Sequence, residues 1–154
     1  MKERTCCFTG HRKIDLLDYI KLKYKLKLQI LLLVEKGIIY FGVGGARGFD
    51  LLAAETILKM KRKYPQIRLI IVLPCNNHYE KWSKKDKKKY FKIEKQSDKK
   101  VYISDKYYMG CMQKRNRHLV DNSKYCIAYK RREYGGTAYT VKYAKMKNLE
   151  IINI

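Results

Sequence analysis

The sequence predicts an α/β fold in which a mostly parallel sheet of about six strands is flanked by helices. Two observations predict this fold. Short apolar runs alternate with longer amphipathic segments along the 154 residues, as strands and helices alternate in a doubly wound sheet. Several of the runs are apolar at consecutive positions, which is typical of strands that are covered on both faces.

The expected elements follow one another regularly along the chain. The strands are expected at residues 5–9, 38–43, 68–73, 100–104, 125–129 and 150–154. The helices are expected at residues 15–36, 50–63, 79–96, 113–122 and 137–147. No proline- or serine-rich linker and no internal repeat interrupts this series. We therefore expect a single Rossmann-like domain that spans residues 1–154.

The segment at residues 15–36 shows two periodicities. A strict alternation of lysine with apolar or aromatic residues over 21–28 favours a strand. A second set has helical spacing and comprises Leu17, Ile20, Tyr24, Leu28 and Leu31. Gly37 supplies a stop for a helix, and a strand of about twenty residues would be unusually long. We therefore predict a helix that carries this apolar set along one face.

The composition is that of a globular protein, with 46% hydrophobic and 32% charged residues. The longest apolar runs, such as residues 30–34, are too short to cross a bilayer, and no apolar stretch follows Lys2 and Arg4 as in a signal peptide. The five cysteines have no C-x-x-C spacing, so neither disulfides nor a zinc site are expected. We expect a cytoplasmic protein without a membrane partner.

The formal net charge of +22 arises from 36 lysines and arginines against 14 acidic residues. Such a field attracts polyanions, including nucleic acid and phosphorylated small molecules. Only nine of the basic residues are arginines, although arginine is the better bidentate phosphate ligand. Two interpretations therefore stand: a polyanion-binding surface, or lysines that solvate ordinary helix faces.

Two of the loops that follow expected strands are suited to binding anions. After the first strand, Gly10 allows a sharp turn, Arg12 can bind a phosphate, and His11 can donate a hydrogen bond or cap the loop. After the second strand lie Gly44, Gly45, Ala46, Arg47 and Gly48, followed by Asp50. Such glycines can expose successive N–H groups to an anion, and Asp50 can cap the helix that follows.

A third loop of this kind follows the fifth strand. Gly135 and Gly136 precede Thr137 at the start of the last helix, which predicts a second phosphate-sized site, with Thr137 as an ordinary cap as the alternative. Arg115 and Asn116 either complete the rim of the pocket or form a solvated helix end. We expect amides from residues 44–48 and 135–137 to converge on one anion.

The remaining candidate features receive structural interpretations. Trp82 is interpreted as a core residue rather than a stacking platform, and the lysine-rich run at 84–89 as the solvated face of a helix. His78 and His118 have no partners at the spacing that metal sites need. We therefore expect no metal site.

As an ordered set, these motifs resemble the SLOG superfamily, in its YpsA/YoqJ-like branch. They comprise residues 8–12, 44–50 with 53–55, 114–117 with 120–123, and 135–137, and the resemblance covers nearly the whole chain. The resemblance implies a Rossmann-like fold, a nucleotide-related ligand and a homo-oligomer. The superfamily also includes the LOG phosphoribohydrolases, the DNA-uptake protein DprA and sensor domains for nucleotide-derived signals.

The last glycine loop departs from the pattern of the hydrolases, which resembles P-G-G-x-G-T-x-x-E. At its proline, third glycine, threonine and acid positions this chain has Tyr134, Ala138, Tyr139, and Val141 or Lys142. The carboxylate that would stabilise an oxocarbenium-like transition state is therefore missing from the matching position. Asp50, Glu55 and Asp121 are the carboxylates that could replace it, and nothing in the sequence selects one.

Three hypotheses about function follow. The leading one is a binding or sensor module for a nucleotide or a nucleotide derivative, which needs no other cofactor. The first alternative is a nucleoside-monophosphate phosphoribohydrolase, which would hydrolyse the N-glycosidic bond. The second alternative is single-stranded DNA binding in the manner of DprA, with nucleic acid as the partner.

Overall fold

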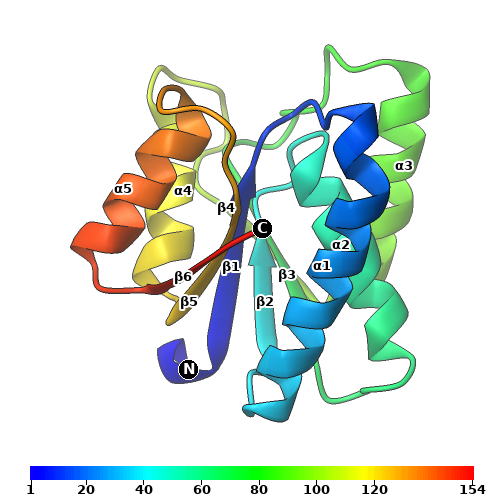
Figure 1. Ribbon diagram of the computed structural model, residues 1–154. Helices are drawn as coiled ribbons and strands as arrows, with labels where there is room; N and C mark the ends of the chain where they lie inside the picture. Colours follow the sequence, from blue (N-terminus) through cyan, green and yellow to red (C-terminus); the bar gives the residue numbers. More distant parts are fainter.

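The computed structural model describes residues 1–154 and confirms the α/β prediction. Six strands form one sheet in the order β4-β3-β2-β1-β5-β6, and every neighbouring pair is parallel (Figure 1). The strands are β1 (Thr5–Gly10), β2 (Tyr40–Val43), β3 (Arg68–Leu73), β4 (Lys99–Tyr102), β5 (Tyr125–Tyr129) and β6 (Glu150–Asn153). The expected sheet was mostly parallel, and the observed one is entirely so.

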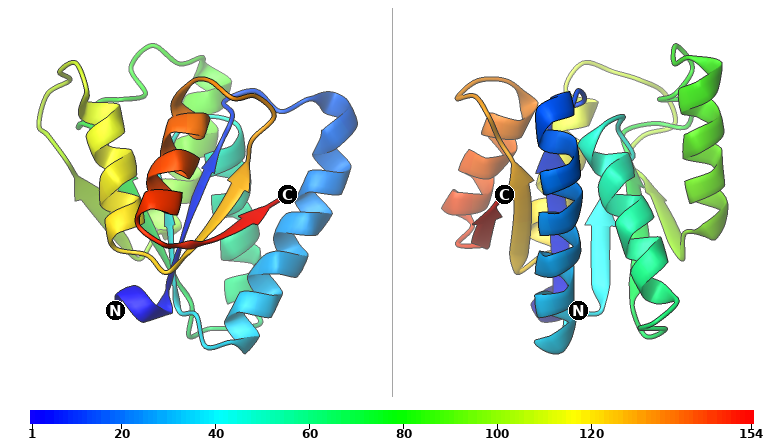
Figure 2. Two further views of the ribbon diagram at one scale, coloured as in Figure 1. Left: turned by 60° about the vertical axis from the view of Figure 1, so that its left-hand side comes forward. Right: turned by 45° about the vertical axis from the view of Figure 1, so that its right-hand side comes forward.

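Helices cover both faces of the sheet, as the doubly wound pattern predicts. The helices are α1 (Leu16–Glu35), α2 (Phe49–Lys61), α3 (Lys84–Gln96), α4 (Cys111–Asp121) and α5 (Gly136–Met146), after a short 3₁₀ turn at Lys2–Arg4. The first three lie on one face, and α4 and α5 lie on the other (Figure 2). None of the helices combines the length and the apolar content that a membrane crossing requires.

The hydrophobic core is unequally divided by the sheet. A cluster of 27 buried residues fills the space between the sheet and α1, α2 and α3, whereas a cluster of 7 lies beneath α4 and α5. Cys7 and Cys126 are register partners on neighbouring strands, and both belong to the smaller cluster. These thiols act as small apolar side chains where α4 and α5 approach the sheet.

Helix α3 begins five residues later than the sequence predicts. The Ser83 side chain accepts a hydrogen bond from the Asp86 N–H at 3.1 Å, so Ser83 is the N-cap and the helix starts at Lys84. Residues 79–82 form turns before it. The prediction placed the start at residue 79 because it assigned the aromatic residues of this turn to the first turn of the helix.

Helix α1 buries a different face from the one that its periodicity suggests. The buried side chains are Leu22, Leu26, Ile30, Leu33 and Val34. Of the expected apolar set, Leu17, Ile20 and Tyr24 lie on the outer face and are 87%, 80% and 71% exposed, whereas Leu31 is half-buried and packs against the main core. This helix has two apolar faces, and periodicity alone does not show which one meets the core.

The strand order places a switch point between β1 and β5. The chain runs outward from β1 through β2 and β3 to β4, then crosses the sheet through α4 and continues with β5 and β6. In open parallel sheets, ligands bind outside the carboxyl ends of the strands at such a point. The loops after β1 and β5 are therefore the first place to look for a site.

Candidate functional site

A cleft of about 840 Å³ opens at the switch point, outside the carboxyl ends of β1 and β5. We call it the β1–β5 cleft. The predicted site residues that line it are Gly10, His11, Arg12, Ala46, Asp50, Arg115, Asn116, Gly136 and Thr137. Four separate segments of the chain therefore meet at one site.

The N-terminus of α5 forms an open wall of the β1–β5 cleft. Gly135 is the N-cap with φ 93°, a conformation that favours glycine, and no side chain caps this end. A Cβ built on Gly136 would meet nothing within 4 Å. The intrahelical ladder begins when the Tyr139 N–H donates to the Gly135 carbonyl, so the preceding N–H groups have no partner within the helix. This helix end can accept an anion.

The loop at residues 44–48 differs from the expected anion nest because its interior is packed. A Cβ on Gly44 would lie 2.7 Å from the Arg115 guanidinium, and one on Gly45 would lie 2.7 Å from Leu73. Gly48 has φ 77° and approaches the backbone of Arg12 too closely for any side chain. Gly44, Gly45, Arg47 and Gly48 do not line the β1–β5 cleft, and only Ala46 of this loop reaches it.

The side chains of Asp50 and Arg115 form hydrogen bonds with the backbone of this loop. The Asp50 carboxylate accepts a hydrogen bond from the Ala46 N–H at 3.2 Å, and the Arg115 guanidinium donates to the Gly44 carbonyl. Both side chains are buried. Burial raises the pKa of Asp50, and the nearby Arg115 charge and the Ala46 and Gly44 amides oppose that rise. The N-cap of α2 is Gly48 rather than Asp50.

His11 joins the loops that follow β1 and β5. Its Nε2 accepts a hydrogen bond from the Arg131 N–H at 2.8 Å, and its carbonyl accepts one from the Phe49 N–H at 3.1 Å. Burial lowers the pKa of His11, and the charges of Arg132 and Arg131 lower it further. Both effects favour the neutral ring, and Nε2 carries no proton where it accepts the Arg131 N–H.

Several residues of the β1–β5 cleft were not predicted from the sequence. They include Thr9, Lys13, Asp18, Met112, Gln113, Tyr129, Arg131 and Arg132. Arg131 is engaged by the Asp18 carboxylate at 3.4 Å and by the Ile154 carbonyl at 2.8 Å. The available signal was position, because Arg131 and Arg132 lie two and three residues after the carboxyl end of the buried strand β5.

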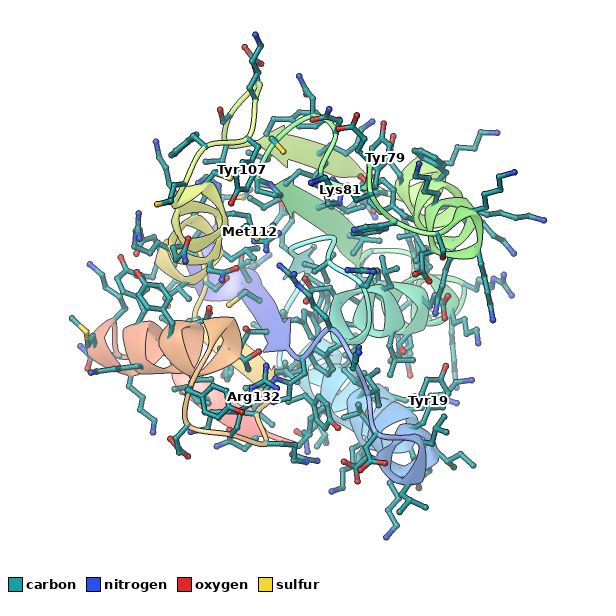
Figure 3. The ribbon with its side chains drawn as sticks, turned by 90° about the horizontal axis from the view of Figure 1, so that it is seen from above. Tyr19, Tyr79, Lys81, Tyr107, Met112 and Arg132 are labelled. Carbon is teal, nitrogen blue, oxygen red and sulfur yellow. The ribbon has the colours of Figure 1, made fainter.

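A second, smaller hollow of about 440 Å³ adjoins the β1–β5 cleft. We call it the Trp82 hollow. The two cavities share Arg12, Ala46, Met112 and Arg115, and the Arg12 guanidinium lies 3.2 Å from the Met112 sulfur between them. Figure 3 shows Tyr107 and Lys81 on one side of Met112 and Arg132 on the other. The two cavities therefore adjoin at the carboxyl edge of the sheet, and we call them together the groove.

The other two candidate carboxylates lie outside both cavities. Glu55 pairs with Lys89 of α3 at 3.4 Å, and Asp121 accepts a hydrogen bond from the Tyr143 hydroxyl at 2.8 Å. The structure brings no three His, Cys, Asp or Glu side chains into a group that could hold a metal ion.

Two solved structures of DNA processing protein A share the fold. The protein from Helicobacter pylori, described with a single-stranded DNA binding mode, gives a TM-score of 0.71 at 19% identity. The protein from Streptococcus pneumoniae gives a TM-score of 0.69 at 14% identity. Each comparison covers 99% of this chain, which spans 65% and 50% of those two chains.

Curated bacterial relatives resemble the chain in sequence. A UPF0398 protein of Halalkalibacterium halodurans is 32% identical over 141 residues, which are 90% of this chain and 72% of that protein. One from Brevibacillus brevis is 29% identical over 132 residues, with 82% of this chain and 69% of that protein covered. The model of the YpsA family, described as the YspA SLOG family, matches residues 6–152. The chain belongs to the YpsA family of SLOG proteins.

Proposed function

We propose that the protein binds a phosphate-bearing, nucleotide-like ligand in the β1–β5 cleft without breaking a bond in it. The observation that carries this proposal is the open N-terminus of α5. Gly136 has free space where a Cβ would lie, and the helix end has no side-chain cap. A phosphate at this position would accept hydrogen bonds from backbone amides and gain from the helix dipole.

The charges of the cleft support an anionic ligand. Arg12, Lys13, Arg115, Arg131 and Arg132 line it, against the three carboxylates Asp15, Asp18 and Asp50. Of these cations, Arg115 and Arg131 are held by carbonyl groups of the protein, whereas Arg12 meets only the Met112 sulfur. A thioether is a weak acceptor, so the Arg12 guanidinium is available to a phosphate.

The carboxylates of the cleft favour binding over hydrolysis. Asp15 caps α1 by accepting the Leu17 N–H at 3.1 Å, and Asp18 accepts the Tyr129 hydroxyl at 3.0 Å. Asp50 is buried and supports the loop at 44–48. Each of the three thus has a structural role in the fold, which favours binding over hydrolysis.

A substitution at Gly136 tests the proposal. The Gly136→Val side chain would fill the open space at the helix end without meeting a neighbour, so we expect the fold to survive and ligand binding to be lost. Isothermal titration calorimetry with AMP, GMP, CMP and UMP would measure the change in Kd. Ala138→Val is the matched control, because it also places a valine on the same helix but outside both cavities.

Equal affinity of the wild type and the Gly136→Val variant would contradict the proposal. Release of free base during incubation with any of the four nucleotides would instead favour the hydrolase.

Single-stranded DNA binding is the second candidate function. The observation that favours it is the similarity of fold to the Helicobacter pylori protein, whose structure is described with that binding mode. The net charge of +22 is compatible with it, because phosphates of any strand would be attracted. The two candidates differ in whether one nucleotide is sufficient for binding or a strand is needed.

A further inference from the structure

The Trp82 hollow has a different chemistry from the β1–β5 cleft. Its walls carry the aromatic side chains of Trp82, Tyr107 and His78, and it contains a single carboxylate, Glu80. The aromatic side chains of the β1–β5 cleft are Phe8 and His11, which are buried, and Tyr129, which stacks on Phe49. A flat aromatic group is therefore suited to the Trp82 hollow and a phosphate to the β1–β5 cleft.

The Trp82 ring is held in place by contacts with neighbouring side chains, and an aromatic ring on which a base stacks needs such support. Its ring makes edge contacts with His78 and Tyr90, at centroid distances of 5.1 and 5.8 Å, and it packs against the main core. The Arg47 guanidinium lies over the ring at 5.5 Å. Contacts with neighbouring side chains thus hold the Trp82 ring, and a planar cation lies over one of its faces. A planar base can stack on this ring in place of the Arg47 guanidinium, at a low cost in conformational entropy because the ring is already held.

The remaining walls supply a second aromatic surface and polar groups. Tyr107, from the segment between β4 and α4, is 66% exposed. Asn77 donates to Glu80 at 3.1 Å, which leaves the Asn77 carbonyl oxygen as an acceptor for the edge of a base. Figure 3 shows Tyr107 and Lys81 approaching the hollow from two different loops.

We propose that the Trp82 hollow binds the base of a mononucleotide whose phosphate lies at the N-terminus of α5. This inference rests on the proposed function and names the ligand class as a base joined to a phosphate through a sugar. The two cavities share four lining residues, so one ligand can occupy both. Arg12, which lies between them, then contacts the middle of the ligand.

The protein carries its own reporter for this proposal, because Trp82 is its single tryptophan. We expect saturable quenching of tryptophan fluorescence by at least one of AMP, GMP, CMP and UMP. Ribose 5-phosphate has the same sugar and phosphate but no base, so we expect it to compete for binding without this quenching. Quenching by a single-stranded oligonucleotide but by none of the mononucleotides would overturn the proposal.

Two variants measure the contribution of the base by calorimetry. Trp82→Leu should weaken mononucleotide binding by about 5-fold to 150-fold, the range for one base stacked on one aromatic side chain, and leave ribose 5-phosphate binding unchanged. Tyr107→Leu should also weaken mononucleotide binding. Because Tyr107 is exposed, this substitution should leave the stability of the fold unchanged. Tyr24→Leu, on the outer face of α1, is the matched aromatic control.

The outcomes separate this inference from the proposed function. Unchanged mononucleotide affinity in both Trp82→Leu and Tyr107→Leu, with Gly136→Val still abolishing binding, would overturn the base site and leave the phosphate site standing. Failure of the wild type to bind either the mononucleotides or ribose 5-phosphate would overturn the proposed function and the base site together.

Discussion

Arg12 and Arg115 line the same cleft but have different surroundings. Arg115 is buried beside Asp50, whereas Arg12 is exposed and contacts the Met112 sulfur. We expect Arg115→Met to destabilise the fold by about 3–5 kcal/mol, because it leaves the Asp50 charge buried without a counter-charge. Arg12→Met should change stability by no more than about 0.5 kcal/mol and should weaken nucleotide binding. Urea denaturation measures the first effect and calorimetry the second.

The Asp50→Asn substitution checks the cause of this difference. Combined with Arg115→Met, it removes the uncompensated charge and should recover much of the lost stability. An Arg115→Met variant as stable as the wild type would show that the loop at 44–48 does not depend on this pair.

At the scale of a residue, the sequence could not predict the role of each loop glycine. Gly44 and Gly136 have the same sequence signature, a glycine in a loop after a buried strand. One leaves room for the Arg115 guanidinium, and the other faces open space. A glycine required for packing and one that makes space for a ligand cannot be told apart before the neighbouring segments are placed.

The two faces of α1 allow a test at the scale of an element. Leu22→Ala removes a side chain from the main core and should cost about 2–5 kcal/mol. Ile20→Ala removes a side chain that is 80% exposed and should change stability by no more than about 0.5 kcal/mol. The free energy of unfolding in urea distinguishes the two. The reverse order would mean that α1 packs through the face carrying Leu17, Ile20 and Tyr24.

The sequence was a better guide to the elements than to the surfaces that they bury. The expected strands at 68–73 and 125–129 match β3 and β5, because uninterrupted apolar runs are typical of strands covered on both sides. The buried face of α1 could not be predicted, because Leu22, Leu26 and Ile30 compete with a second apolar set on the same helix. Amphipathic spacing identifies faces, and tertiary packing selects between them.

At the scale of the whole molecule, the net charge of +22 can attract a single-stranded oligonucleotide without a specific site. The salt dependence of binding distinguishes this general attraction from binding at a specific site. We expect a single-stranded oligonucleotide to bind at low salt, with the logarithm of the binding constant falling linearly with the logarithm of salt concentration. Arg47→Ala and Lys88→Ala should then weaken binding equally, because each removes one charge from the same field. The salt dependence of binding is large between roughly 50 and 200 mM salt. Fluorescence anisotropy over this range measures the binding constant and its salt dependence for each of the two variants.

Binding that persists at the higher salt concentration and is lost in Arg47→Ala alone would contradict this expectation. Arg47 lies over Trp82 at the edge of the groove, whereas Lys88 is exposed on α3 away from both cavities. A difference between these two variants therefore locates the strand in the groove. In that case single-stranded DNA, rather than a mononucleotide, would be the ligand that occupies the Trp82 hollow.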